Sequence, residues 1–128
     1  MTDIVEAVRD LMVADTTGVF ALTNTRIYPG MIPLGTTLPA ISYKRVDETS
    51  DNVTDYDVLR LQVTSVASTY LGSLALAAAV RKLLNRKKGV SATRPYRISF
   101  IIQTEDEDSV SKTHWVNADY RIVYQYLE

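Results

Sequence analysis

Hydrophobic and polar positions follow two different periods in the middle of the chain. Leu59, Leu61 and Val63 alternate with polar residues, which is the period-two pattern of a strand with one buried face. Over residues 70–88, alanine, leucine and valine recur at spacings of three and four, which is typical of an amphipathic helix. The many alanines would let that helix lie close on a sheet. This stretch therefore predicts a strand over residues 59–68 and a long helix after it, on which the rest of the chain packs.

The same patterns predict three further strands and a second helix. An apolar stripe at helical spacing marks residues 2–13, and Thr2 is placed to cap the first turn. Residues 40–46, 96–104 and 114–127 show the alternation of strands.

Polar segments separate these elements. Residues 47–57 and 105–112 are rich in acids and are predicted to be loops at the tips of two antiparallel hairpins. Residues 26–40 hold three of the four prolines and are predicted to be an extended connector. The order of elements indicates one α+β domain spanning residues 1–128, in which an antiparallel sheet of about four strands carries two helices on one face.

The composition narrows the possible functions. Of the 128 residues, 46% are hydrophobic and 23% are charged, as expected for a globular domain. The net charge of −1 argues against a strongly basic, nucleic-acid-binding chain. Neither a secretory signal nor an apolar run of membrane-spanning length is apparent. We therefore expect a protein of the cytoplasm with no membrane partner.

Side chains suited to catalysis are scarce. The chain has no cysteine and one histidine, His114, which leaves no Cys nucleophile and argues against a nucleophilic triad or an imidazole-rich metal site. We interpret His114 as an exposed hairpin residue. No glycines have the spacing of a phosphate-binding loop, and the acidic stretches do not match a calcium-binding loop. We therefore expect no catalytic residue, no metal and no cofactor.

Charged residues gather in three stretches. Two are acidic and lie in the predicted loops, and one is basic and lies toward the C-terminal end of the predicted long helix. The simplest interpretation is that the acids keep loop tips solvated and that the cations, followed by Gly89, close the helix against its own dipole. The candidate assembly contacts are Asp47, Glu48, Asp51, Asp55, Asp57, Arg81, Lys82, Arg86, Lys87, Lys88, Glu105, Asp106, Glu107 and Asp108.

Two functional interpretations of these charges are open. In a head-to-tail ring of identical subunits, an acidic tip on one subunit can meet a basic helix end on the next. Alternatively, the basic run contacts phosphates in a small nucleic-acid-binding module, although no sheet face combines aromatic and basic residues as single-strand-binding proteins do.

Several short motifs carry a resemblance to a known family. They are RIYP at residues 26–29, LPAISY at 38–43, LRLQV at 59–63, STY at 68–70 and LAAAVRKLL at 76–84, followed by an aromatic-rich last strand. In this order the chain resembles the tail-completion or tail-terminator proteins of long-tailed bacteriophages. The resemblance covers nearly the whole chain, and RIYP followed by LPAISY is its most specific part.

The resemblance implies a structural role. A protein of this kind forms a ring, usually a hexamer, at the head-proximal end of the tail tube in the virion, after assembly in the host cytoplasm. It ends tube polymerisation and offers a surface for the head. Its partners would be its own copies, the tail-tube protein and the head-neck connector, with DNA only passing through the ring. No enzymatic activity is implied. A neck or head-closure protein is the alternative within the same machinery.

Overall fold

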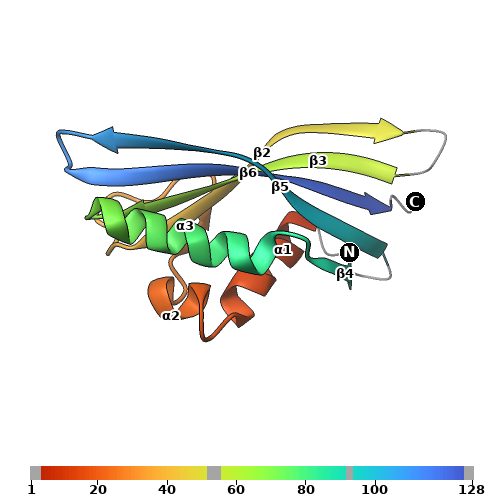
Figure 1. Ribbon diagram of the computed structural model, residues 1–128, viewed down its shortest axis with the longest axis horizontal. Helices are drawn as coiled ribbons and strands as arrows, with labels where there is room; N and C mark the ends of the chain where they lie inside the picture. The colour runs from red at the N-terminus through yellow and green to blue at the C-terminus, as the bar shows by residue number, and fades with distance from the viewer. Residues whose placement is uncertain (1–3, 52–55, 92–93, 126–128) are drawn as a thin grey trace.

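The computed structural model describes residues 4–51, 56–91 and 94–125. Within these residues a six-stranded sheet carries three helices on one face (Figure 1). The elements are, in chain order, α1 (Ile4–Ala14), α2 (Val19–Thr23), β1 (Ile27–Pro29), β2 (Ala40–Asp51), β3 (Tyr56–Ala67), α3 (Tyr70–Leu84), β4 (Lys88–Ser91), β5 (Arg94–Asp108) and β6 (Thr113–Gln125).

The strands lie in the order β1-β2-β3-β6-β5-β4. Neighbouring strands are antiparallel except β1, which runs parallel to β2. The predicted α+β class and the placement of the helices on one face are confirmed. The predicted sheet of about four strands, wholly antiparallel and with two helices, is wrong in its counts. β1, β4 and α2 are too short to show a hydrophobic period. The strands β1 and β4 form because they pair with β2 and β5, which the local sequence does not indicate.

The central strand and helix form the middle of the core, as predicted. Leu59, Leu61 and Val63 of β3 are fully buried, and Leu76 and Val80 are buried on α3. That helix lies against β3, β6 and β5, while α1 and α2 pack beside it. Across the described residues, no helix is long and apolar enough to span a membrane.

The two long hairpins extend further than predicted. β2 continues to Asp51 and β5 to Asp108, so most of the acidic residues expected in loops lie in strands. Asp47 pairs with Arg60 on β3, and Glu107 pairs with His114 on β6. These hairpins turn at opposite ends of the molecule, and the β2–β3 hairpin reaches past the helices (Figure 1). Residues 44–50 are exposed and residues 101–108 are exposed or half-buried, so these strand ends need no alternating apolar residues and the period-two pattern is lost.

The long helix ends earlier than predicted. α3 stops at Leu84 with Asn85 as its C-cap, whereas the sequence predicted a helix through Lys88 closed by Gly89. The Asn85 side chain instead accepts a hydrogen bond from the Phe100 amide of β5 at 3.1 Å, and this contact turns the chain toward the sheet. Gly89 then lies in β4, where a Cβ atom would come within 2.5 Å of the Tyr96 hydroxyl.

Candidate assembly surfaces

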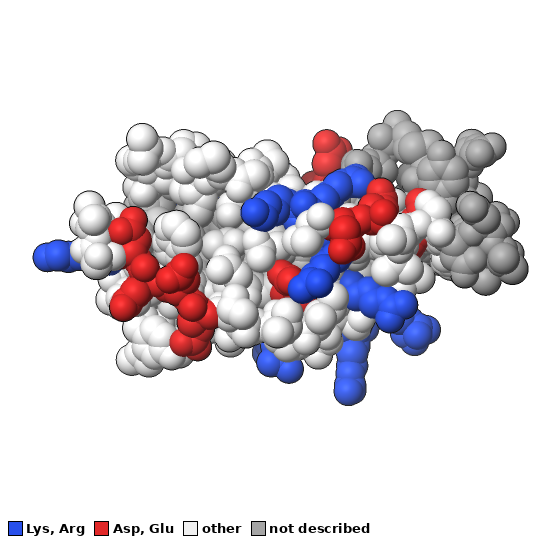
Figure 2. All heavy atoms as spheres, turned by 90° about the horizontal axis from the view of Figure 1, so that it is seen from above, with Lys and Arg blue, Asp and Glu red and all other residues white. Residues whose placement is uncertain are grey.

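The sheet face that the helices leave uncovered is unevenly charged. Figure 2 shows a group of acidic side chains at the end where the β5–β6 hairpin turns, and most basic side chains, interspersed with further acids, in the other half of this face. Alternation along β5 places Asp106 on this face, because its neighbours Glu105 and Glu107 contact groups on the helix-bearing side. The candidate acids are therefore split between the two faces of the sheet.

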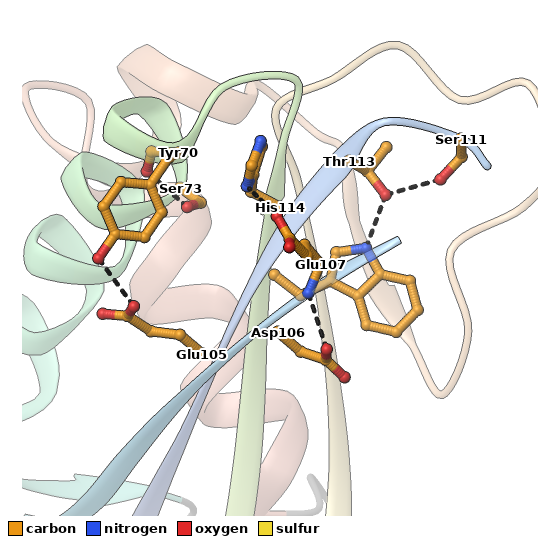
Figure 3. A network of polar contacts seen from close by, with 9 residues as sticks. Tyr70, Ser73, Glu105, Asp106, Glu107, Ser111, Thr113 and His114 are labelled. Carbon is orange, nitrogen blue, oxygen red and sulfur yellow. Dashed lines mark hydrogen bonds and ion pairs between the residues drawn. The ribbon is translucent and has the colours of Figure 1, made fainter. Parts of the chain in front are cut away.

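The end of β5 holds the first acidic cluster, which Figure 3 shows in detail. Glu105 accepts a hydrogen bond of 2.8 Å from the hydroxyl of Tyr70, the first residue of α3, and this bond raises the pKa of Tyr70. Asp106 accepts from the Glu107 amide at 2.8 Å. The Asp108 carboxylate accepts from the Val110 amide at 3.0 Å, and this bond lowers the pKa of Asp108. The four acids are exposed or half-buried and are fixed along a strand.

His114 lies beside this cluster and is half-buried. Its ring stands edge-on to that of Tyr70, with the ring centres 6.0 Å apart, and its Nδ1 lies 3.8 Å from the Glu107 carboxylate (Figure 3). The prediction that His114 is an exposed hairpin residue is correct in its place at the hairpin, but the side chain is half-buried. A packed aromatic contact, rather than a nucleophile or a metal, accounts for its position.

The second acidic cluster, at the end of the β2–β3 hairpin, has exposed acids at Asp47 and Glu48 and one buried acid, Asp57. Glu48 forms an ion pair of 3.0 Å with Arg45 and accepts a hydrogen bond of 2.6 Å from the Tyr124 hydroxyl. Asp57 is buried on β3, opposite Tyr124, so the prediction that it belongs to a solvated loop is wrong. Asp55 and the side chain of Asp51 lie outside the part of the chain that the structure describes.

The five basic candidates do not form one cluster. Arg81 stacks its guanidinium over the Phe100 ring, 3.9 Å from the ring centre. Lys82 lines a shallow hollow between α2 and α3. Arg86 has a φ of +64° in the turn after α3, and the two lysines that follow enter or adjoin β4, where the Lys87 carbonyl accepts from the Ile98 amide at 2.8 Å. Only Arg86, Lys87 and Lys88 form a continuous basic surface candidate.

Sequence reasoning missed two cations on the opposite edge of the sheet. Lys44 and Arg45 are exposed on β2, next to the point where its register with β3 shifts. On the uncovered face, Lys44 and Asp106 both line a hollow of about 420 Å³ together with Met31 and Trp115. The signal in the sequence is a pair of adjacent cations in a predicted strand, which is weaker than the longer charge runs of the loops and the helix end.

A polar ladder crosses the uncovered face between β3 and β6. Arg60 donates from Nε to the Asp119 carboxylate at 2.9 Å, and Thr64 donates to the Asn117 side chain at 2.8 Å. These pairs hold the two central strands in register. Within the described residues, no group of three histidine or carboxylate side chains is placed to hold a metal ion.

Comparison with protein families decides the broad assignment. The family model for the tail completion protein gp17 matches residues 4–125. The chain belongs to this family. The resemblance inferred from its motifs is thereby confirmed, and this tail completion protein is a structural component of a phage-type tail. It belongs to a machinery whose members work by contact with other tail or virion proteins.

A solved structure shares the fold of this tail completion protein. A chain from the virion of a native gene transfer agent (GTA) particle superimposes with a TM-score of 0.76, over 93% of this chain and 92% of that chain. Their sequences are 18% identical, so this likeness concerns the fold alone. A search of curated proteins finds no match.

Proposed function

We propose that this tail completion protein caps the head-proximal end of the tail tube as a ring, and thereby ends tube polymerisation and provides the head-docking surface. The observation that carries the proposal is the family match over residues 4–125. The ring is expected to be a hexamer, assembled in the host cytoplasm before the head joins. Its partners are its own copies, the tail-tube protein and the head-neck connector.

The arrangement of the molecule is suited to such a joint. The two hairpins turn at opposite ends of the molecule (Figure 1), and on the uncovered face the β5–β6 end is mainly acidic while the other half carries most of the cations together with further acids (Figure 2). Copies arranged side by side with their long axes aligned would make a ring whose two rims differ in charge. A joint between a tube and a head needs this polarity, because each rim must accept one partner and reject the other.

The remaining candidate contacts fit the same proposal. Arg86, Lys87 and Lys88 follow α3, away from the acidic end of β5, and in this proposal they contact a neighbouring virion protein. The acids of β2 and β3 occupy the β2–β3 hairpin, which lies at the end of the molecule opposite the β5–β6 turn. No step of the proposal requires a catalytic group, so the protein acts through binding alone.

Purified protein mixed with purified tail tubes tests this function. We expect rings in electron micrographs at one end of each tube only, and tubes that no longer elongate when tube protein is added. The mass of the free protein, measured across concentration, shows whether the ring forms before the tube is met. If the protein binds head connectors but leaves tube ends bare and growing, it is a neck or head-closure protein instead.

A further inference from the structure

Two long stretches of strand edge are open in this sheet. β4 pairs with β5 only over Arg94–Arg97, and β1 pairs with β2 only over Ile41–Tyr43. Among the described residues, no strand flanks the outer side of β5 over residues 101–108 or that of β2 over residues 44–51. Such edges present a row of backbone donors and acceptors to which another strand can add.

The two open edges lie on opposite sides of the sheet and toward opposite ends of it. β2 and β5 stand on the two sides of the central β3–β6 pair, and their hairpins turn at opposite ends of the molecule (Figure 1). Three successive antiparallel pairings separate them, so β2 and β5 run in opposite directions. A second copy placed beside the first in the same orientation therefore meets β5 with its own β2 in antiparallel fashion.

The charges are complementary where the acidic end of β5 would meet the first two residues of the open stretch of β2. The acids further along β2, Asp47 and Glu48, fall opposite Gln103 and Ile102 when Asp106 stands opposite Lys44. Residues 105–108 of β5 are all acidic, whereas the open stretch of β2 begins with Lys44 and Arg45. Two β5 edges would place acids opposite acids, which is unfavourable, while β5 against β2 places acids opposite cations. The charges thus disfavour a two-fold contact and favour a head-to-tail one, which is the kind that generates rings.

The orientation of the side chains is compatible with one register that pairs the opposite charges. Lys44 and Asp106 both face the hollow on the uncovered side of the sheet, so they can stand opposite each other in a shared sheet. This pairing places Arg45 opposite Glu105, whose side chain lies on the helix-bearing side with Tyr70. Arg45 alternates with Lys44 and therefore points to that side as well.

Apolar side chains along the same edges also favour the contact. Ile101 and Ile102 on β5 are 44% and 48% exposed, and Val46 on β2 is 47% exposed. In the register given above, all three lie within the shared stretch. A strand added along each edge would remove part of this apolar area from water.

We propose that β5 of one copy pairs antiparallel with β2 of the next, with Asp106 opposite Lys44 and Glu105 opposite Arg45, so that the sheet continues from subunit to subunit. The inference rests on the proposed ring and names its contact. It replaces Arg86–Lys88 as the partner of the acidic stretch. Lys88 pairs with Arg97 of β5 itself, so those cations lie on the same side of the sheet as the acids rather than on the side that a neighbour would present.

The absence of cysteine from the chain makes a direct test possible. Two variants, Lys44→Cys and Asp106→Cys, are mixed, assembled on tail tubes and oxidised mildly. Residues directly opposite in an antiparallel pair have Cβ atoms about 4.5–5.5 Å apart, so we expect a disulfide-linked dimer on a non-reducing gel. The matched control mixes Lys44→Cys with Glu105→Cys, whose thiol stands on the other sheet face and should cross-link weakly.

Two outcomes overturn the edge pairing, and they can be told apart. If rings form on tubes but the Lys44→Cys variant links to neither of the two β5 variants, or equally to both, the shared sheet is wrong while the ring stands. If no ring forms with the unaltered protein, the proposed function fails and the contact fails with it.

Charge reversal supplies a second test should the thiol variants not assemble. Lys44→Glu or Asp106→Lys alone should raise the concentration needed for ring formation at least about threefold, and mixing the two should restore part of the loss. Equal assembly of the unaltered protein, both single variants and their mixture would contradict the proposed pairing.

Discussion

At the scale of single residues, the last strand places two tyrosines in contrasting surroundings. Tyr120 is fully buried, and its hydroxyl finds no hydrogen-bond partner in the described part of the chain. The Tyr124 hydroxyl instead donates to Glu48 at 2.6 Å. An unpartnered buried hydroxyl costs free energy, whereas a satisfied one stabilises the fold. The two positions therefore respond in opposite ways to removal of the hydroxyl.

We expect Tyr120→Phe to raise the free energy of unfolding by about 1 kcal/mol, because it removes a buried polar group without leaving a cavity. Tyr124→Phe, the matched control on the same face of the same strand, should lower it by about 1 kcal/mol through loss of the bond to Glu48. Urea unfolding followed by circular dichroism measures both. A loss of stability in Tyr120→Phe would show that its hydroxyl is satisfied in solution.

The same tyrosines predict how stability depends on alkaline pH. Burial raises the pKa of Tyr43, Tyr96, Tyr120 and Tyr124 above the ordinary value of 10.0, with the Glu48 carboxylate contributing at Tyr124. Above that pH the unfolded chain loses protons that the folded chain keeps, so the stabilisation present below it is lost as the pH rises. Urea midpoints measured between about pH 9 and pH 11 should fall, and less so in Tyr120→Phe. A constant midpoint over this range would contradict the assignment.

At the scale of elements, the packing of α3 on the sheet carries much of the stability. Leu76 is fully buried on this helix, whereas Leu71, nearer its start, is 75% exposed. We expect Leu76→Ala to cost about 2–5 kcal/mol of unfolding free energy, since it removes buried contacts and leaves a cavity. Leu71→Ala makes the same chemical change on the open side and should stay within about 0.5 kcal/mol. Comparable losses would mean that Leu71 is covered in solution.

The hydrophobic period predicted the helices and strands that bury one face in the core. It failed for segments whose side chains are mostly exposed. Leu59, Leu61 and Val63 alternate because α3 covers one side of β3, so this strand and its helix were found from the sequence. Residues 105–108 of β5 are acidic and exposed or half-buried, so they carry no apolar period, and their composition favours a loop although they form a strand. The short edge strand β4 begins at Lys88 because Asn85 and Lys87 accept hydrogen bonds from β5. These contacts join residues far apart in the chain, so no local sequence pattern predicts them.

The residues of the candidate assembly surfaces were predictable from the sequence only in part. Composition and spacing identified the charged stretches and excluded thiol chemistry, and family motifs identified the kind of protein. The burial of Asp57 and the separation of Arg81 from Lys88 depend on strand register and on where α3 ends. That Lys44 and Arg45 lie on an open strand edge follows from the order of the strands in the sheet, which the sequence does not show.

At the scale of the whole molecule, the two ends differ, and a ring of aligned copies would carry this difference to its two rims. Arg86, Lys87 and Lys88 lie toward one end of the long axis, and the β5–β6 turn with its acids lies at the other (Figure 1). We expect the triple charge reversal of these cations to leave ring formation intact but to abolish binding to one of the two partners, the tail tube or the head connector. Each rim can meet only one of them.

The reciprocal variant completes this experiment. Glu107→Lys changes an exposed acid at the opposite end of the molecule, one residue past the stretch proposed to pair with Lys44 and Arg45, so rings should still form. It should weaken binding to the other partner while sparing the first. Co-sedimentation with tubes, and separately with connectors, distinguishes the two losses. Because contacts between charged surfaces are screened by salt, both wild-type affinities should also fall as ionic strength rises. If both variants lost the same partner, the two charged ends would face one side of the ring, and the polarity argued above would have to be abandoned.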